Sequence, residues 1–383
     1  MFLRDGFESE GEIHMLGARI GANLECGGAK LRNKGGTTLA ADGLTTDGGV
    51  FLNERFESDG ATRPRVARIF ESDGEIRLRV ARIRGTLACV GAKLRHPGER
   101  ALALDGARIE GAFLLRGRRT SVTGAVDLTG AEISHLYDDP NCWPEARGDV
   151  VLDRCVYGAF IGGGVDAATR IAWLDRQDPA RFGQDFWPQP WEQCAKVLRE
   201  MGHPEDSRAV LIAKEERQRR ARRLRAPLWL RPLLAMRDGA LGATVGYGRS
   251  PMWAFAWLAA FWLVGAALFH DADRFGALRP NDPAALLTTE WRDCAAPSVA
   301  DRTACWRATP AGRDWPAFDP LVYSLDTVLP VVDLRMARWW TPDEGAPWRF
   351  ARATRVWMQL QILAGWALSL LAVAGFSGLV KSD

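Results

Sequence analysis

Apolar residues recur two positions apart throughout residues 1–135, and each pair encloses one charged residue. The small member of each pair is alanine, and the large member is isoleucine or leucine. Two-residue spacing is the period of a β-strand, so both apolar side chains face one side while the charged side chain faces water. Glycines near the pairs suit tight corners. The pattern predicts short strands, and the pairs are Ala18/Ile20, Ala29/Leu31, Ala67/Ile69, Ala81/Ile83, Ala92/Leu94, Ala107/Ile109 and Ala131/Ile133.

The strand pattern lies within a longer repeat. FLRDGFESEG from Phe2 returns as FLNERFESDG from Phe51, and a weaker third copy begins at Leu114. Within the second copy, FESDGATRPRVARI at residues 56–69 is followed directly by FESDGEIRLRVARI at residues 70–83. Such periods indicate a stacked array in which each unit buries its apolar edge against its neighbours. Short parallel strands with glycine corners therefore predict a parallel β-solenoid.

With these phrases, residues 1–135 resemble the pentapeptide-repeat proteins. The resemblance implies a right-handed, four-sided β-helix that stacks one large apolar residue beside a small one two positions earlier. This chain departs from the family in two ways. Its phrases recur about every ten or eleven residues rather than in unbroken fives, and the middle residue of each phrase is not Asp or Asn.

The middle residues of the phrases are mostly basic, so we expect a basic ridge along one edge of the solenoid. Such a ridge could meet nucleic acid, anionic lipid or an acidic protein. The favoured interpretation is that these charges keep a regular stack soluble and discourage edge-to-edge association. A net charge of +3 over 383 residues does not by itself indicate nucleic-acid binding. We expect a protein partner for the solenoid and no nucleic acid. The ridge residues are Arg19, Lys30, Arg68, Arg82, Lys93 and Arg108.

Two uncharged runs, at residues 251–269 and 356–380, are long enough to cross a membrane. The first would extend for about 28 Å as a helix, which is close to the thickness of the bilayer core. An Arg-rich stretch precedes it and favours the cytoplasmic side, and no cleavable signal peptide precedes the repeats. We therefore expect an integral inner-membrane (cytoplasmic-membrane) protein with both termini in the cytoplasm. The basic residues of that stretch are Lys214, Arg217, Arg219, Arg220, Arg222, Arg223 and Arg225.

The sequence thus predicts a multidomain chain. A helical hairpin links solenoid and membrane, because apolar residues at helical spacing flank Gly202 and Pro204. The expected segments are a β-solenoid (1–135), a cap and linker (136–189), a helical hairpin with a basic end (190–225), a juxtamembrane amphipathic segment (226–250), a first transmembrane helix (251–269), an extracytoplasmic loop (270–318), a short apolar, re-entrant candidate segment (319–340) and a second transmembrane helix (356–380).

The seven cysteines and five histidines have no metal-ligand spacing, and we expect no cofactor. Cys26 and Cys89 occupy equivalent repeat positions, which indicates small buried core residues. Cys294 and Cys305 lie in the loop between the membrane runs, which faces an oxidising compartment in this topology. They are a candidate disulfide contributing about 2–3 kcal/mol, and the alternative is two free thiols.

The segment DPLVYSLDTVLPVVDL, residues 319–334, carries Asp319, Asp326 and Asp333 at seven-residue spacing. This spacing would place the carboxylates on one helical face, although Pro330 must bend or end that helix. In one interpretation the segment is re-entrant and the carboxylates line a water-filled path. In the other, the segment lies on the outer membrane surface and its Asp residues pair with Arg335 or Arg338.

The order of helix, loop, short apolar helix and helix resembles two-helix cation channels of the potassium-channel type. TVLPVVDL lies where such channels carry their TVGYG filter, but it contains no glycine, so the resemblance does not imply potassium selectivity.

Two functions follow from these predictions. The first is a membrane-anchored scaffold that presents the solenoid to a cytoplasmic partner. The second is an oligomeric pore that is gated through the solenoid. The small-residue pairs Gly365/Ser369 and Ala374/Gly378 permit close helix association with either function, and a homo-oligomer is an expected assembly. Similar bacterial proteins are sometimes described as membrane-associated oxidoreductases, but no nucleotide loop, haem motif, redox cysteine pair or catalytic triad supports an enzyme here.

Overall fold

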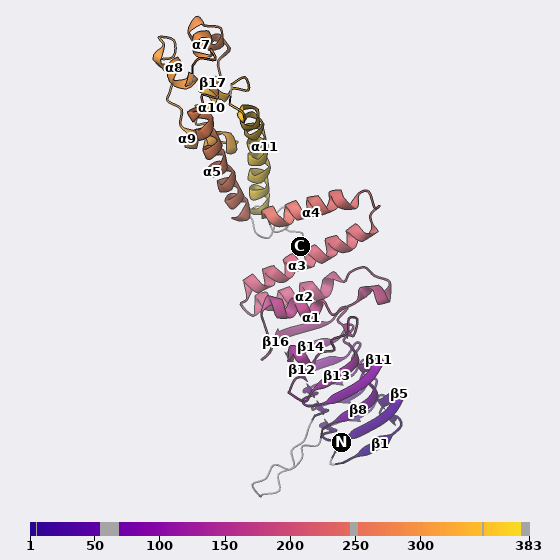
Figure 1. Ribbon diagram of the computed structural model, residues 1–383. Coiled ribbons are helices and arrows are strands. Elements are labelled where there is room, and N and C mark those ends of the chain that lie inside the picture. The colour runs from indigo at the N-terminus through magenta and orange to yellow at the C-terminus, as the bar shows by residue number, and fades with distance from the viewer. Residues whose placement is uncertain (5, 54–68, 246–251, 300, 347, 377–383) are drawn as a thin grey trace. The chain divides into compact units, whose positions relative to one another are not determined.

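The computed structural model describes residues 1–4, 6–53, 69–245, 252–299, 301–346 and 348–376. The chain divides into two compact units, residues 1–231 and 232–383, which are described separately. The first unit contains a β-solenoid followed by helices, and the second contains two long apolar helices with shorter elements between them (Figure 1).

The solenoid has about five turns of short parallel strands. Its strands form two sheets, whose order shows that each turn pairs with the turns before and after it. The long-strand sheet contains β1 (Glu8–Glu10), β2 (Ile13–His14), β5 (Lys30–Ala40), β8 (Glu71–Arg77), β11 (Lys93–Ala103), β13 (Ser121–Asp127) and β15 (Val150–Val151). The short-strand sheet contains β3 (Arg19–Ile20), β4 (Leu24–Glu25), β6 (Thr45–Thr46), β7 (Val50–Phe51), β9 (Arg82–Ile83), β10 (Leu87–Ala88), β12 (Arg108–Leu115), β14 (Glu132–Asp138) and β16 (Val156–Phe160).

The predicted alternation along the strands is confirmed by burial. Both apolar members are buried in five phrases, whereas the charged residue between them is exposed or half-buried. The apolar pairs therefore form one continuous core along the stack, as a repeat array requires. These five pairs are Ala29/Leu31, Ala81/Ile83, Ala92/Leu94, Ala107/Ile109 and Ala131/Ile133.

The strand register identifies the length of one turn. Leu24, Val50, Leu87 and Phe113 lie at matching positions of successive turns. The first and last of these steps are 26 residues each, whereas the step from Val50 to Leu87 is 37. That longer step contains the duplicated FESDG unit, of which the second copy provides β8. The repeat of 49 residues seen in the sequence is therefore close to two turns.

One corner of the solenoid repeats a left-handed backbone conformation from turn to turn. Glycine occupies this corner at Gly17, Gly43, Gly106 and Gly130, with φ between +62° and +70°. The amide of each of these glycines donates to a carbonyl of the next turn. Val80 and Arg154 occupy the same corner with φ of +53° and +56°. A β-branched residue is strained in this region, so Val80 lowers the stability of its turn.

The solenoid continues beyond the predicted boundary at residue 135. β15 pairs in parallel with β13, and β16 pairs with β14 from Glu132 to Leu136. The irregular connection between β14 and β15, which includes the short 3₁₀-helix η1 (Pro140–Cys142), interrupts the alternation and hides this last turn in the sequence. The strand stack therefore ends at Phe160.

Helix α1 (Ala167–Leu174) follows the last turn and is joined to it by a buried ion pair. Arg170 donates two hydrogen bonds of 2.9 Å to the two carboxylate oxygens of Asp138, and both side chains are 1% exposed. Trp143 donates a third bond of 2.7 Å to Asp138, and the Arg170 guanidinium lies 3.7 Å from the Phe160 ring centroid. A buried charge pair needs this degree of compensation, so the contact fixes α1 in one position.

The predicted helical hairpin is confirmed as α2 (Pro188–Glu200) and α3 (Pro204–Arg225), which follow the 3₁₀-helix η2 (Pro179–Phe182). Gly202 adopts φ of +87° between the two helices, as a helix end often requires. Gln193 of α2 donates a hydrogen bond of 2.6 Å to the carbonyl of Tyr157 in β16. The hairpin therefore packs against the solenoid's last turn within the first unit.

The second unit contains two long apolar helices, as predicted. They are α5 (Met252–Arg274) and α11 (Ala351–Phe376), and they pack side by side (Figure 1). The predicted run at residues 356–380 extends beyond Phe376, outside the described residues. The other elements are α4 (Arg231–Val245), β17 (Leu278–Pro280), α6 (Pro283–Leu286), α7 (Thr289–Cys294), α8 (Arg302–Ala308), α9 (Pro320–Val328), α10 (Met336–Trp339) and β18 (Trp340–Pro342).

Replacing Val80 with glycine should stabilise the solenoid. Glycine adopts positive φ without the Cβ clash, so Val80→Gly should raise the free energy of unfolding by about 1 kcal/mol after the entropic cost of glycine. Val156→Gly is the matched control, because Val156 is also exposed but lies in β16. The control should destabilise by about 0.5–1 kcal/mol. Denaturant unfolding followed by circular dichroism measures both, and a destabilised Val80→Gly protein would contradict the corner assignment.

Candidate functional site

The short helix α9 packs between α5 and α11, and it positions the predicted acidic residues. Asp319 caps its N-terminus by accepting bonds of 2.9 and 3.1 Å from the amides of Leu321 and Val322. The helix ends at Val328, since the residue before Pro330 is extended. The three carboxylates therefore do not share one helical face. Asp319 is the cap, Asp326 lies in the last turn, and Asp333 lies in the following loop.

Both later carboxylates hold the loop that follows α9. Asp326 accepts bonds of 2.7 and 2.8 Å from the amides of Leu334 and Ala337. Asp333 accepts a bond of 2.9 Å from the amide of Arg335, whose φ is +63°. The chain thus turns back beside α9 after it leaves the helix. The predicted acidic residues accept hydrogen bonds from backbone amides. Among the described residues, no ion pair joins Asp326 or Asp333 to Arg338.

A buried polar network connects α9 to both long helices, and the sequence analysis missed it. Gln361 of α11, which is fully buried, has its Nε2 within 2.8 Å of the Ser324 carbonyl and 3.1 Å of Thr327 Oγ1. Its Oε1 accepts a 2.7 Å bond from Trp357. Ser324 in turn donates a 2.7 Å bond to the carbonyl of Trp262 in α5. The signal that could have revealed it is a glutamine inside an apolar run.

Glycines allow the three helices to approach closely at this network. A Cβ at Gly265 of α5 would overlap Ser324 and Gln361, and a Cβ at Gly365 of α11 would overlap the carbonyl of Val328. Small residues at such positions let helix backbones pack in contact. Gly365, which the sequence predicted as a site of close helix association, contacts α9 of its own chain.

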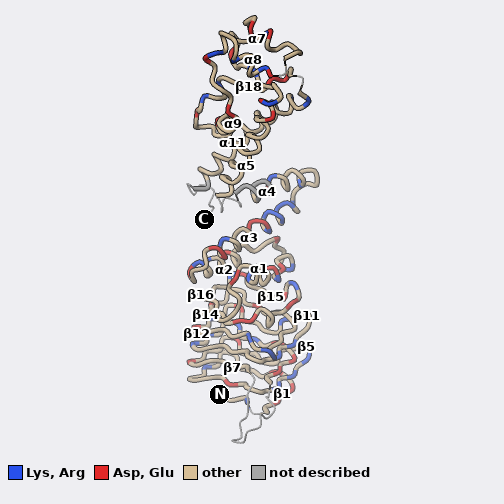
Figure 2. Tube along the Cα trace, turned by 60° about the vertical axis from the view of Figure 1, so that its left-hand side comes forward, with Lys and Arg blue, Asp and Glu red and all other residues tan. Residues whose placement is uncertain are grey.

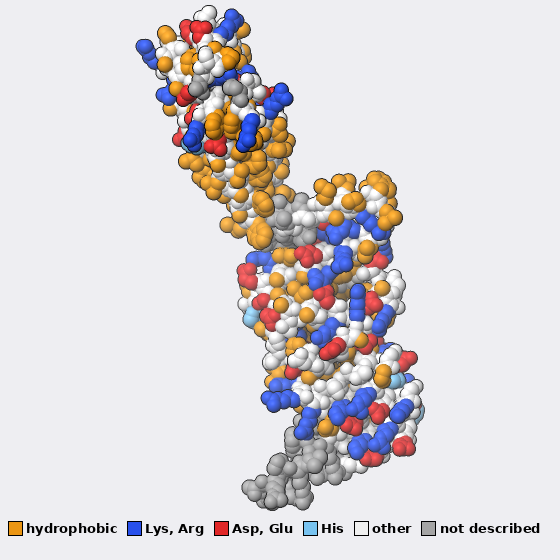
Figure 3. Space-filling view, in the orientation of Figure 1, with side chains coloured by type: hydrophobic (Ala, Val, Ile, Leu, Met, Phe, Trp, Pro, Cys, Tyr) orange, Lys and Arg blue, Asp and Glu red, His pale blue; other side chains and the backbone are white. Residues whose placement is uncertain are grey.

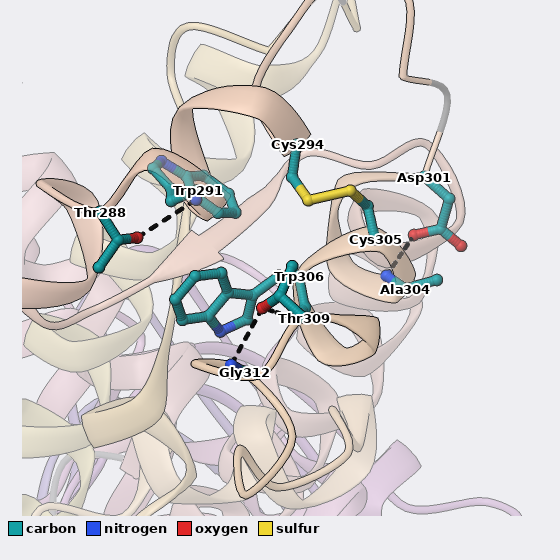
Figure 4. The surroundings of a disulfide bond; sticks show 9 residues. All are labelled: Thr288, Trp291, Cys294, Asp301, Ala304, Cys305, Trp306, Thr309 and Gly312. Atoms are coloured by element: carbon teal, nitrogen blue, oxygen red, sulfur yellow. Dashed lines mark hydrogen bonds between the residues drawn. A yellow bond between two sulfur atoms is a disulfide. The ribbon is translucent and has the colours of Figure 1, made fainter.

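The elements between α5 and α9 form a small aromatic cluster with a disulfide. Cys294 at the end of α7 is bonded to Cys305 of α8 (Figure 4). Thr288 caps α7 by accepting from the Trp291 amide, and Asp301 caps α8 by accepting from the Ala304 amide. The Trp291 ring packs edge-on against Trp306, with centroids 6.0 Å apart. β17 pairs antiparallel with β18 beside this cluster.

The predicted basic ridge is distributed over two sheets rather than one edge. Lys30 and Lys93 lie in the long-strand sheet, and the register places Glu71 between them. Lys93 pairs with Glu71 at 3.2 Å, and Lys30 pairs with Glu8 at 3.4 Å. Figure 2 shows basic and acidic residues interspersed over the solenoid. This face therefore carries a ladder of alternating charge.

The other ridge residues lie in the short-strand sheet, except Arg68, which lies outside the described residues. Arg82 and Arg108 occupy neighbouring turns, whereas Thr45 separates Arg82 from Arg19. Arg108 pairs with Glu132 at 2.6 Å, and this hydrogen bond raises the pKa of Arg108 and lowers that of Glu132. Phrases of similar sequence thus point to different sides, because one turn contains several phrases.

The free cysteines are core residues of the first unit. Burial raises the pKa of Cys26, Cys89, Cys155 and Cys194 to about 12, and Cys142 is also buried. Such thiols are unreactive at neutral pH. Among the described residues, no cluster of His, Cys, Asp and Glu could hold a metal ion.

Comparison with protein-family models, curated proteins and solved structures finds no match to this chain. The family resemblances and the right-handed sense of the solenoid therefore stay predictions from the sequence. The β-solenoid repeat fold itself suggests a non-enzymatic scaffold.

The close approach at Gly365 can be tested directly. Gly365→Leu should lower the free energy of unfolding by about 1–3 kcal/mol or more, because its side chain must displace the end of α9. Ala367→Leu is the matched control, since Ala367 is exposed on the same helix. Thermal unfolding of the full chain in detergent measures both variants. Equal effects of the two substitutions would contradict the described packing.

Proposed function

We propose that this protein is a membrane-anchored repeat scaffold, which presents its β-solenoid to a protein partner in the cytoplasm. The observation that carries this proposal is the exposure of apolar surface on α5 and α11. Only 28% and 22% of their apolar windows are buried, although both helices are long and apolar enough to cross a membrane. A core helix of a soluble protein would be mostly buried, and exposed apolar surface of this extent marks an interaction with a membrane or a partner.

The distribution of side chains supports insertion in the inner membrane. Figure 3 shows hydrophobic side chains covering α5 and α11, while charged side chains gather around the small helices between them. The basic end of α3 favours a cytoplasmic location for the first unit and for both termini. The disulfide between Cys294 and Cys305 favours an oxidising compartment for the loop between the helices.

The charge ladders of the solenoid support a protein partner over nucleic acid. In the long-strand sheet, Arg32 lies near Glu10 and Arg95 lies near Asp73, in the same alternation as the lysine positions. Nucleic-acid binding requires a run of unneutralised positive charge along one face. A surface of alternating charge suits a protein whose charges alternate in the complementary order.

The anchor and the scaffold are tested together on the full chain. We expect the protein to stay in the membrane fraction after an alkaline wash, and a chain that ends at Arg231 to be soluble with sheet circular dichroism. A photoreactive group placed at Arg82 or at Arg95 should give a protein adduct at one sheet face. With the group at Arg82, Arg108→Glu on the neighbouring turn should abolish the adduct, and with the group at Arg95, Arg32→Glu in the same sheet should do so. Release of the full chain by alkali would contradict the anchor, and the absence of an adduct at both positions would contradict the scaffold.

A second candidate function is an oligomeric pore gated through the cytoplasmic solenoid. The observation that favours it is the polar network around Gln361, which holds a short helix between two apolar helices. A membrane anchor alone needs no such helix.

Conductance tests this second candidate. Planar bilayers that contain the full chain should show currents, and Asp333→Asn should reduce them because Asp333 is exposed in the loop after α9. Asp314→Asn is the control, since Asp314 is exposed in the loop before α9. Silent bilayers would contradict the pore and leave the scaffold in place.

A further inference from the structure

The end of α9 lies deep within the apolar layer formed by α5 and α11. Val328 packs in one cluster with Leu258 of α5 and Leu368 of α11. At 1.5 Å per residue, Leu258 is about 20 Å from Asp271, the first charge that follows it on α5. Gly365, which contacts the Val328 carbonyl, is about 15 Å from Arg355 on α11 by the same rule. These distances amount to about one half and two thirds of a hydrocarbon core about 30 Å thick, so the end of α9 lies well inside such a core.

The loop that follows α9 is exposed in the single chain at this depth. Val331 is 87% exposed, and its neighbours through Arg335 are exposed as well, including Asp333. The loop stays at the depth of the end of α9 although the chain turns back there. The Leu334 amide donates a hydrogen bond to Asp326, which lies in the last turn of α9.

Lipid cannot be the neighbour of this loop. Non-helical backbone at membrane depth occurs only where protein covers it or where it faces a water-filled cavity. Charged side chains such as Asp333 and Arg335 also need protein or water around them, because burying a charge in hydrocarbon costs free energy. A single inserted chain supplies neither cover nor water. The membrane form must therefore contain something more than one copy of the second unit.

We propose that the loop Val331–Arg335 is covered by further copies of this chain, which together enclose a water-filled space that the loop lines. This inference rests on the proposed membrane anchoring. A second copy is the partner that fits, because the loop carries one acidic and one basic residue, Asp333 and Arg335, and is thus complementary in charge to itself. A closed ring of copies also supplies the same cover to every loop.

The experiment places a fluorescent thiol label at the loop in the full chain. Val331→Cys is labelled with a bimane maleimide, and the protein is inserted in vesicles of phosphatidylethanolamine and phosphatidylglycerol. The native cysteines do not compete, because two form the disulfide and five are buried. Leu263→Cys is the matched control, since Leu263 is exposed on α5 at a similar depth. Val332→Cys replaces Val331→Cys if that variant does not fold.

Two quenchers and a mass measurement give the result. We expect aqueous iodide to remove most of the fluorescence at Val331→Cys, while a nitroxide at mid-depth in the lipid chains leaves it unchanged. Leu263→Cys should show the reverse. The mass of the complex in lipid nanodiscs should correspond to several copies. Quenching by the lipid nitroxide at Val331→Cys would overturn the inference.

A single copy in the nanodisc would also overturn it, even with iodide quenching, because the loop would then lie at the membrane surface. In both cases the chain would still be in the membrane, so the scaffold proposal would survive. Failure of the full chain to enter vesicles at all would instead contradict the anchoring itself.

Discussion

Every backbone N–H and C=O needs a partner, and this constraint governs both units of the chain. In the solenoid each turn is too short to satisfy its own backbone, so the turns before and after supply the bonds. In the second unit the long helices satisfy their backbones internally, which is what an apolar solvent demands. The two units thus satisfy one rule in different ways. In each unit, backbone groups lose these regular partners where the pattern of strands or helix is interrupted.

The interruption in the second unit occurs where α9 ends. Four carbonyls at a helix end lose their intrahelical partners, and the loop beyond adds amides of its own. The structure supplies side-chain acceptors for these loop amides, since Asp326 accepts from Leu334 and Ala337, and Asp333 accepts from Arg335. One of the two interpretations from the sequence placed these carboxylates on a single face lining a path. Their contacts give them a prior structural role, because without them the loop could not fold back beside α9.

Much of the fold could be predicted because its signals are local. Alternation over three residues identified the buried pairs of the strands, and uncharged runs identified α5 and α11. The end of the stack could not be placed, since the irregular segment before β15 removes the alternation although the last turn still pairs. The ridge failed for a different reason. Which phrase lies above which depends on the register between turns, and that register sets Glu71 between Lys30 and Lys93.

The position of the candidate site could be predicted from the sequence, but the contacts within it could not. An apolar segment with acidic residues between two long runs indicated where a short helix would lie, and α9 lies there. Its attachment depends on Trp262, Ser324 and Gln361, which come from three segments that no sequence window joins. A glutamine buried between helices stabilises the structure only when each of its polar atoms is hydrogen-bonded. Gln361 therefore stabilises the arrangement of α9 that satisfies its amide and disfavours arrangements that leave it unpaired.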